Sequence, residues 1–282
     1  MNTSSFKSTE EILGAVESFP SLPQAVVEII RSIDDDSMTP QLLTRKIESD
    51  LGMLAGVLKL ANSSRYAVRG GVSSPQQAVT ILGFNAIRNL ACLDGLSSHF
   101  RENSHDDFNF GKFMRHSIGV ACCAKFIARR IHLNPDIAFV AGLLHDVGQL
   151  VVAVTLPGEL HAVMEYKKRQ DCHISVAEHA VLGIDHAGIG AHLVDRWNFP
   201  SAIGEAIGGH HHVFDDVSSR MADTVHVAEV LSHALDFGGS GQVPPLSHGA
   251  MMRLELSFQQ MQSHFGEIED EYSDFAKVLG VD

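Results

Sequence analysis

The sequence contains few cysteines. Only four occur among 282 residues, none of them form a CxxC pair, and Cys122 and Cys123 are adjacent. Disulfide frameworks and thiolate zinc sites need several cysteines at regular spacings, so neither is expected here. Scarce cysteines of this kind are typical of a protein from a reducing compartment.

Basic residues and long apolar runs are also scarce. Lysine and arginine number 21 against 34 acidic residues, which gives a formal net charge of −13. Binding to nucleic acid or to an anionic membrane surface depends on cations, so neither partner is expected. No run of about 18 apolar residues is present, and the first residues lack the basic start and apolar stretch of a signal peptide. We therefore expect a cytoplasmic protein without a membrane span.

What the sequence does have is a large apolar fraction and many histidines. Apolar residues make up 45% of the chain, enough for the core of one large domain or two ordinary ones. There are 17 histidines. Histidine is the commonest metal ligand and the usual proton carrier near neutral pH, so the search for function starts with these residues.

Apolar residues recur at helical spacing through most of the chain. Within 22–33 they fall three and four positions apart, as on one buried face of a helix. Thr39–Pro40 and Ser74–Pro75 are typical helix starts, and Gly83 is expected to end the second of these helices. The apolar run 151–154 is interpreted as an extension of a buried helix. The predicted class is all-α, with further helices near 53–61, 85–96, 112–131, 136–150, 158–170, 175–182, 186–197, 200–208 and 218–236, and one or two within 250–279.

Two segments divide the chain. The polar stretch 99–110 is the best candidate for a linker, and 238–249 is rich in glycine and proline. The predicted parts are an N-terminal tail (1–14), an N-terminal helical bundle (15–105), a second helical domain (106–237), and a loop with C-terminal helices (238–282).

An adjacent His145–Asp146 pair ends a predicted apolar helix. Such a pair can reach one metal ion from two sides, although it also suits a histidine that caps a helix beside a surface carboxylate. Further histidines lie on apolar helix faces, where a single buried histidine is usually a hydrogen-bonded core residue. Several together can satisfy one another through a metal ion, and zinc, iron and manganese all accept imidazole with carboxylate. These positions are His116, His186, His210, His211 and, on a later helix, Glu229.

A rival metal site lies on the predicted helix 218–236. His226, Glu229 and His233 share one of its faces at steps of three and four. The segment lacks the HExxH pattern that such helical sites usually have. We therefore favour His226 and His233 as flanking residues rather than ligands.

Short motifs follow one another along the chain in a specific order. No single motif is specific, but the set is. They are FPSLP (19–23), IESD (47–50), LANS (60–63), AVTILG (78–83), GLLHDVGQL (142–150), DHA with Gly190 (185–190), WNFP (197–200) and the histidine pair 210–211. This ordered set resembles an HDOD domain over roughly residues 15–237.

The resemblance implies an all-helical fold related to the HD and HD-GYP metal-dependent phosphohydrolases, with the N-terminal bundle packed on an HD-like domain. In those relatives, histidines and acidic residues at the matching positions bind two or more metal ions. For this chain the resemblance implies one or two divalent ions of iron, manganese or zinc, with His145 and Asp146 as the catalytic pair. The implied ligands are His116, His145, Asp146, His186, His210, His211 and Glu229.

Several positions depart from these relatives. Gln149 stands where the cyclic-dinucleotide phosphodiesterase branch has a lysine, and no GYP loop follows the histidine pair 210–211. Lys112 replaces a glutamate that some relatives have, and becomes a candidate phosphate contact. Leu51 replaces a usual proline, which is expected to affect only a local turn. These departures argue against cyclic-di-GMP hydrolysis more than against metal binding.

Two functions fit this set of residues, besides a purely structural role. Many HDOD domains have lost most ligands and act as regulatory modules, so the resemblance implies a signal-transduction protein that serves a signalling partner, here with a retained metal site. The alternative is a metal-dependent phosphohydrolase that acts on a phosphorylated nucleotide or a related small molecule. Elemental analysis followed by a phosphodiesterase assay separates the two.

Overall fold

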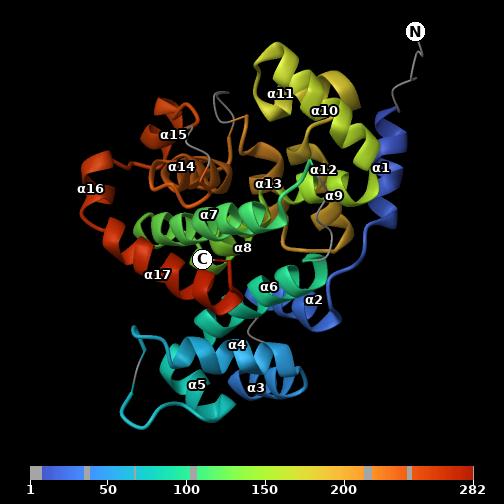
Figure 1. Cartoon of the computed structure of the whole chain (residues 1–282). Helices are drawn as coiled ribbons and strands as arrows, with labels where there is room; N and C mark the ends of the chain where they lie inside the picture. Colours follow the sequence, from blue (N-terminus) through green and yellow to red (C-terminus); the bar gives the residue numbers. More distant parts are fainter. Residues whose placement is uncertain are drawn as a thin grey trace.

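The part of the chain that the structure describes consists of helices joined by turns and loops (Figure 1). The structure is a computed structural model that describes residues 8–34, 39–66, 68–101, 107–212, 218–239 and 243–281. No strand occurs within these ranges, which confirms the predicted all-α class. The first helices are α1 (Thr9–Ser18), α2 (Gln24–Arg31), a short 3-10 turn (Ser32–Asp34), α3 (Pro40–Glu48), α4 (Leu51–Ala61), α5 (Pro75–Leu82) and α6 (Phe84–Phe100). The later ones are α7 (Phe110–Arg130), α8 (Pro135–Leu144), α9 (Val147–Thr155), α10 (Pro157–Gln170), α11 (Ile174–Leu182), α12 (His186–Arg196), α13 (Ser201–Gly209), α14 (Arg220–Ala234), α15 (His248–Arg253), α16 (Phe258–Gln262) and α17 (Phe265–Leu279).

Several helices begin where side chains cap them. The side chain of Thr39 accepts a hydrogen bond from the Leu42 amide at the start of α3. Ser74 does the same for the Gln77 amide at the start of α5. Gly83 has a φ of 77°, a left-handed value that ends α5 and lets α6 follow at once. These boundaries confirm the prediction from the capping residues.

The segment predicted as one helix over 136–150 is two helices. α8 ends at Leu144, His145 and Asp146 form the junction, and α9 begins at Val147. The prediction of a single helix was wrong because apolar residues continue across the junction at helical spacing. The break turns the two polar side chains out of the regular helix, which matters for the site described below.

The same region is the one part of the described chain with a membrane-like composition. The stretch 135–155 is long and apolar enough to cross a membrane by length and composition, but 89% of its most apolar window is buried inside the protein. A buried core helix can have the same length and apolar composition as a membrane-spanning helix. Inspection of the sequence found no uninterrupted apolar run because His145, Asp146 and Gln149 interrupt it. As predicted, the run 151–154 is helical.

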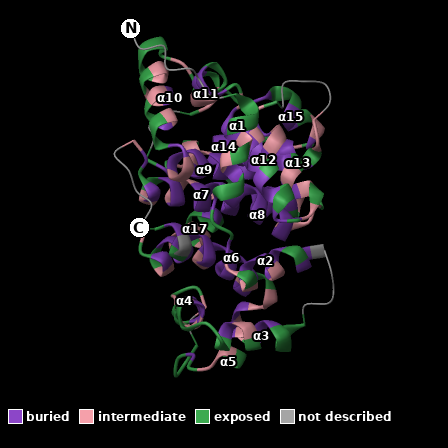
Figure 2. Ribbon diagram, turned by 90° about the vertical axis from the view of Figure 1, so that its right-hand side faces the viewer, coloured by how far each residue is buried: buried purple, intermediate pink, exposed green. Residues whose placement is uncertain are grey.

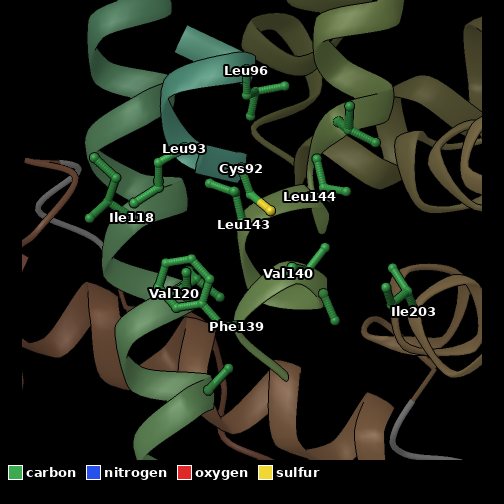
Figure 3. Packing of buried hydrophobic residues seen from close by; sticks show 14 of the residues in the cluster. Cys92, Leu93, Leu96, Ile118, Val120, Phe139, Val140, Leu143, Leu144 and Ile203 are labelled. Atoms are coloured by element: carbon green, nitrogen blue, oxygen red, sulfur yellow. The ribbon is translucent and has the colours of Figure 1, made fainter. Parts of the chain in front are cut away.

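One apolar core joins the N-terminal helices to the later ones (Figure 3). Cys92, Leu93 and Leu96 of α6 pack near buried side chains of α7 and α8, and α8 in turn packs on α13, whose Ile203 belongs to the same core. Figure 2 shows that α7, α8, α9 and α14 are largely buried, whereas α3, α4 and α5 expose more of their surface. A buried ion pair crosses the same contact, with Arg88 Nη2 2.9 Å from Asp136 Oδ2.

Helix α1 lies partly within the segment predicted as a tail, 1–14. Ser8 caps it and exchanges two hydrogen bonds with Glu11, the reciprocal pattern of a capping box. Ile12 and Val16 are fully buried. The helix packs on α9 and α12, both of which carry or follow candidate site residues.

The C-terminal end of α12 is tied to the N-terminal helices. Arg196 donates a hydrogen bond to the Val16 carbonyl at 2.6 Å, and Arg31 donates two to the Trp197 carbonyl, at 2.7 and 2.9 Å. The Trp197 ring lies 6.3 Å from that of Phe19. These contacts fix one end of α12, while His186 lies at the other end.

Two other predicted segments differ from the structure. α6 continues to Phe100, so helix extends into the predicted linker 99–110, of which 102–106 lie outside the described residues. The one or two helices expected within 250–279 are three short-to-medium helices, α15 to α17. α17 packs on α7, α4 and α6, so the C-terminal region also contacts the N-terminal bundle.

Two glycines let α9, α12 and α13 approach closely. A Cβ atom at Gly148 would lie 2.0 Å from the carbonyl oxygen of His186. One at Gly190 would lie 2.9 Å from the Ile207 side chain. The backbones of α9 and α12 therefore touch without side chains between them, and this contact brings Asp146 beside His186.

Candidate metal centre

The candidate residues come from the ends or inner faces of five helices. His116 lies in the second turn of α7, and His145–Asp146 forms the junction between α8 and α9. His186 begins α12, the pair 210–211 follows α13, and Glu229 lies on α14. Since α13 packs against both α12 and α14, these separate segments meet in one place.

The carboxylate of Asp146 is at the middle of the cluster. Its Oδ2 atom lies 3.5 Å from His145 Nε2 and 3.8 Å from His116 Nε2. Its Oδ1 atom lies 3.0 Å from His186 Nε2 and 4.0 Å from His210 Nε2. One carboxylate oxygen thus faces each of two groups of histidines.

The outward nitrogens of three of these rings are held by fixed hydrogen bonds. His145 Nδ1 donates to the Gly142 carbonyl at 2.8 Å, and His210 Nδ1 donates to the Ile207 carbonyl at 2.6 Å. A carbonyl only accepts, so Nδ1 carries the proton and, in the neutral ring, Nε2 is left with its lone pair. His186 Nδ1 lies 2.5 Å from Glu178 Oε2. All three rings therefore aim Nε2 at Asp146.

The inward nitrogens lie within hydrogen-bond distance of one another, but one of them has no partner among the described residues. His116 Nε2 is 3.2 Å from His145 Nε2, and His211 Nε2 is 2.8 Å from His186 Nε2. His210 Nε2 is buried with no hydrogen-bond partner in the part of the chain described. A buried unsatisfied nitrogen costs about 1–3 kcal/mol. A cation held by these rings would remove this cost.

Burial keeps four of the histidines neutral. Burial first, and then the neighbouring histidines, lower the pKa of His116 to about 3 and that of His211 to about 2. Burial also lowers the pKa values of His145 and His210. Neutral imidazole is the form that binds a metal ion, so these rings need to release no proton at neutral pH.

For His186, Asp146 and Glu229, neighbouring charges act on the pKa together with burial. Burial lowers the pKa of His186, but Glu178 and Asp146 raise it more, so it lies well above its ordinary value. Burial raises the pKa of Asp146, but the surrounding histidines lower it more, so this carboxylate stays ionised. Burial, followed by the charge of Asp146, raises the pKa of Glu229 to about 8.

A cavity of about 750 Å³ opens onto the cluster. Lys112, Lys167 and Gln149 line it, together with the acidic residues Asp107 and Asp171. Lys112 is exposed, and its charge contributes to the low pKa of His116. The apolar part of the lining includes Phe108, Phe113, Leu160, Met164, Pro244 and Pro245. The arrangement can therefore receive a molecule with both a phosphate and an apolar portion.

The comparison with known families decides the identity of this fold. A model of the HDOD domain matches residues 19–213, well over half of the chain. The chain belongs to the HDOD family. The resemblance inferred from the ordered motifs is thereby confirmed, and so is the relation to an all-helical fold.

Individual proteins and structures similar to this chain are distant from it in sequence. A protein from Treponema pallidum is 25% identical over 272 residues, 93% of this chain but 50% of that protein, so the chain spans about half the length of this curated relative. A proposed signal transduction protein from Marinobacter aquaeolei is 25% identical, with a TM-score of 0.77 over 99% of this chain and 63% of the other. A proposed phosphohydrolase from Shewanella amazonensis shares the fold, with a TM-score of 0.76 and 21% identity over 95% and 97% of the two chains.

Sequence reasoning missed one member of the cluster of this HDOD protein, Glu178, and set aside another, His233, as a flanking residue. Glu178 of α11 accepts hydrogen bonds from both the ring and the amide of His186, at 2.5 and 2.9 Å. His233 lies with Glu229 and His116, whose ligand atoms are all within 4.8 Å of one another. The sequence did contain a signal for His233, because it lies on the same helix face as Glu229.

His226, Glu229 and His233 of α14 do not form a site of their own, in agreement with the sequence analysis as far as His226 is concerned. Nε2 of His226 accepts a hydrogen bond from the Ser247 amide at 3.1 Å, and the ring also hydrogen-bonds the backbone of His210. His226 therefore joins the end of α13 to the start of α15. Glu229 and His233 lie instead with His116 of α7.

Proposed function

We propose that this HDOD protein is a signal-transduction protein whose histidine cluster binds one or two divalent transition metal ions. The observation that carries the proposal is the orientation of the rings: Nδ1 of His145, His186 and His210 is hydrogen-bonded outward, and Nε2 points inward. Metal-ligating histidines have this second hydrogen bond, which fixes the tautomer and the ring.

The donor set fits such ions. His116 and His145 face Oδ2 of Asp146, and His186 and His210 face Oδ1. A carboxylate can bridge two cations, whereas an imidazole cannot, so Asp146 would be shared if two ions bind. His211 would complete the second group, and Glu229 with His233 would extend the first. Iron, manganese and zinc accept this mixture of imidazole and carboxylate.

The test compares two histidines of the same helix. His186 lies in the cluster, and His192 is exposed further along α12. Purified wild-type protein is expected to contain iron, manganese or zinc by elemental analysis, the His192→Ala variant to contain the same amount, and the His186→Ala variant to contain less. Equal metal content in all three, or no metal even after incubation with each ion, contradicts the proposal.

A second candidate function is hydrolysis of a phosphorylated small molecule at the same centre. The cavity that opens onto Asp146 favours it, because Lys112 and Lys167 supply cations for a phosphate beside an apolar wall. Bound metal ions acidify a coordinated water and polarise a phosphoryl oxygen. The residues of the chain would attract and orient the ligand: the exposed ammonium of Lys112 the phosphate, and Phe113 and Met164 the apolar part.

A hydrolysis assay separates the two candidate functions. The manganese-loaded protein is given p-nitrophenyl phosphate and bis-p-nitrophenyl phosphate, with Asp146→Ala as the inactive control. Turnover that is lost in this variant supports the hydrolase. Metal binding without turnover of either ester supports a regulatory module, whose partner would be a signalling protein or a phosphorylated ligand that is bound but not cleaved.

A further inference from the structure

A second hollow lies at the far end of α7 from the histidine cluster. Its volume is about 990 Å³, and none of its lining residues line the first cavity. Arg130 lies fourteen positions after His116, which places the two about 21 Å apart along the helix. In Figure 1 this end of α7 lies near α14, α15 and α16. We define the basic hollow by the three arginines that line it, Arg130, Arg220 and Arg253, which lie beside His132 and His264.

Two arginines of the basic hollow are held in place without a carboxylate. The guanidinium of Arg130 lies over the ring of Phe126, 3.4 Å from its centre, and donates to the carbonyl of that residue at 3.3 Å. Arg220 donates to the Ile131 carbonyl at 3.4 Å. Neither arginine forms a salt bridge with any residue that the structure describes. Their positive charges are therefore oriented but not neutralised.

The third arginine is fixed differently. Arg253 forms a two-pronged ion pair with the fully buried Asp223, through bonds of 2.7 Å from Nε and from Nη2. This pair neutralises part of its charge and sets the plane of its guanidinium. Glu255 is the acidic residue among those that line the hollow, and Glu267, outside the lining, is hydrogen-bonded to His264 at 3.0 Å. The lining therefore has three arginines and one carboxylate, in a chain whose net charge is −13.

We propose that the basic hollow binds a small molecule that carries two or more linked phosphate groups. Arginine suits phosphate because its planar fork offers parallel N–H donors. A single phosphate would fill little of a space of about 990 Å³, whereas ligand sites for small molecules commonly have volumes of about 300–1,000 Å³. The site is distinct from the histidine cluster and does not depend on metal binding there.

The experiment is calorimetric titration of the full chain with pyrophosphate, ADP and adenosine at low ionic strength. Pyrophosphate and ADP are expected to bind and adenosine is not, since the arginines recognise the phosphates. The Arg130→Gln/Arg220→Gln double variant should weaken binding by about tenfold or more, because each lost charge-assisted hydrogen bond contributes at least that factor. Arg129→Gln, which removes an exposed neighbouring charge outside the hollow, should change the affinity less than about twofold.

Two further arms make the result decisive. His186→Ala, which disrupts the histidine cluster, should leave one pyrophosphate site, and adding the two arginine substitutions should remove it. If the double variant fails to fold by circular dichroism, Arg220→Gln alone replaces it, since this exposed side chain makes only one weak contact. Three outcomes overturn the proposal: no binding of either phosphate compound, equal binding of adenosine, or binding that is lost in His186→Ala and kept in the arginine variant.

Discussion

Replacement of Gly148 by alanine tests whether backbone contact between α9 and α12 builds the site. The new Cβ would lie 2.0 Å from the His186 carbonyl oxygen, and an ordinary contact begins near 3.4 Å. The start of α12 must therefore move by about 1.4 Å, the difference between these distances. A shift of that size separates His186 Nε2 from Asp146 Oδ1, which now lie 3.0 Å apart.

The energetic result follows from two opposing effects. Overpacking of a tight core costs about 1–3 kcal/mol or more. Alanine in a helix interior recovers roughly 0.5–1 kcal/mol relative to glycine. A clash with backbone is relieved less easily than one with a flexible side chain, so we expect net destabilisation of about 1–2 kcal/mol, together with loss of bound metal.

Urea unfolding and elemental analysis of Gly148→Ala measure both effects. Gly204→Ala in α13 is the matched control, because its Cβ would meet only the Val194 side chain at an ordinary 3.6 Å. The control should be as stable as the wild type or slightly more stable. A Gly148→Ala protein of wild-type stability and wild-type metal content would refute the reasoning.

Three other substitutions give direct readouts. Asp146→Ala should remove a second bound ion and abolish the rise in melting temperature on metal addition, because a ligand of the native state alone stabilises it; a melting curve in excess manganese checks this. Lys112→Ala should weaken phosphate-ester binding about two- to tenfold at unchanged metal content, as measured by KM or by competition with phosphate. Arg88→Met should cost about 3–5 kcal/mol in denaturant unfolding because it leaves Asp136 buried and unpaired, whereas the double replacement with Asp136→Leu should recover most of the loss.

Local signals explain which parts of the fold could be predicted. Thr39 and Ser74 cap helices because their side chains suit that position, and this information is present in a few adjacent residues. The capping box of Ser8 and Glu11 is an equally local signal for α1, which the sequence analysis passed over. The break after Leu144 has no such signal, since it depends on how α9 packs against α12.

In the candidate site, too, residues within local motifs could be predicted, and residues placed by tertiary packing could not. The histidines and Asp146 were identified from an ordered set of motifs, and the structure brings those positions together. Glu178 could not be found this way, because its bond to His186 joins two helices whose relative orientation is a tertiary property. His226 and His233 lie on one face of α14, yet they have different neighbours, because α7 covers one and the start of α15 covers the other.

The attachment of α12 has a mechanical consequence. The helix has eleven residues, so it is a rod about 16 Å long with little axial compliance. At its far end, Arg196 and Trp197 are bonded to Val16 and Arg31 of the N-terminal segment. A displacement of that segment along the helix axis would therefore reach His186, which begins the helix, and would change the spacing between His186 and Asp146.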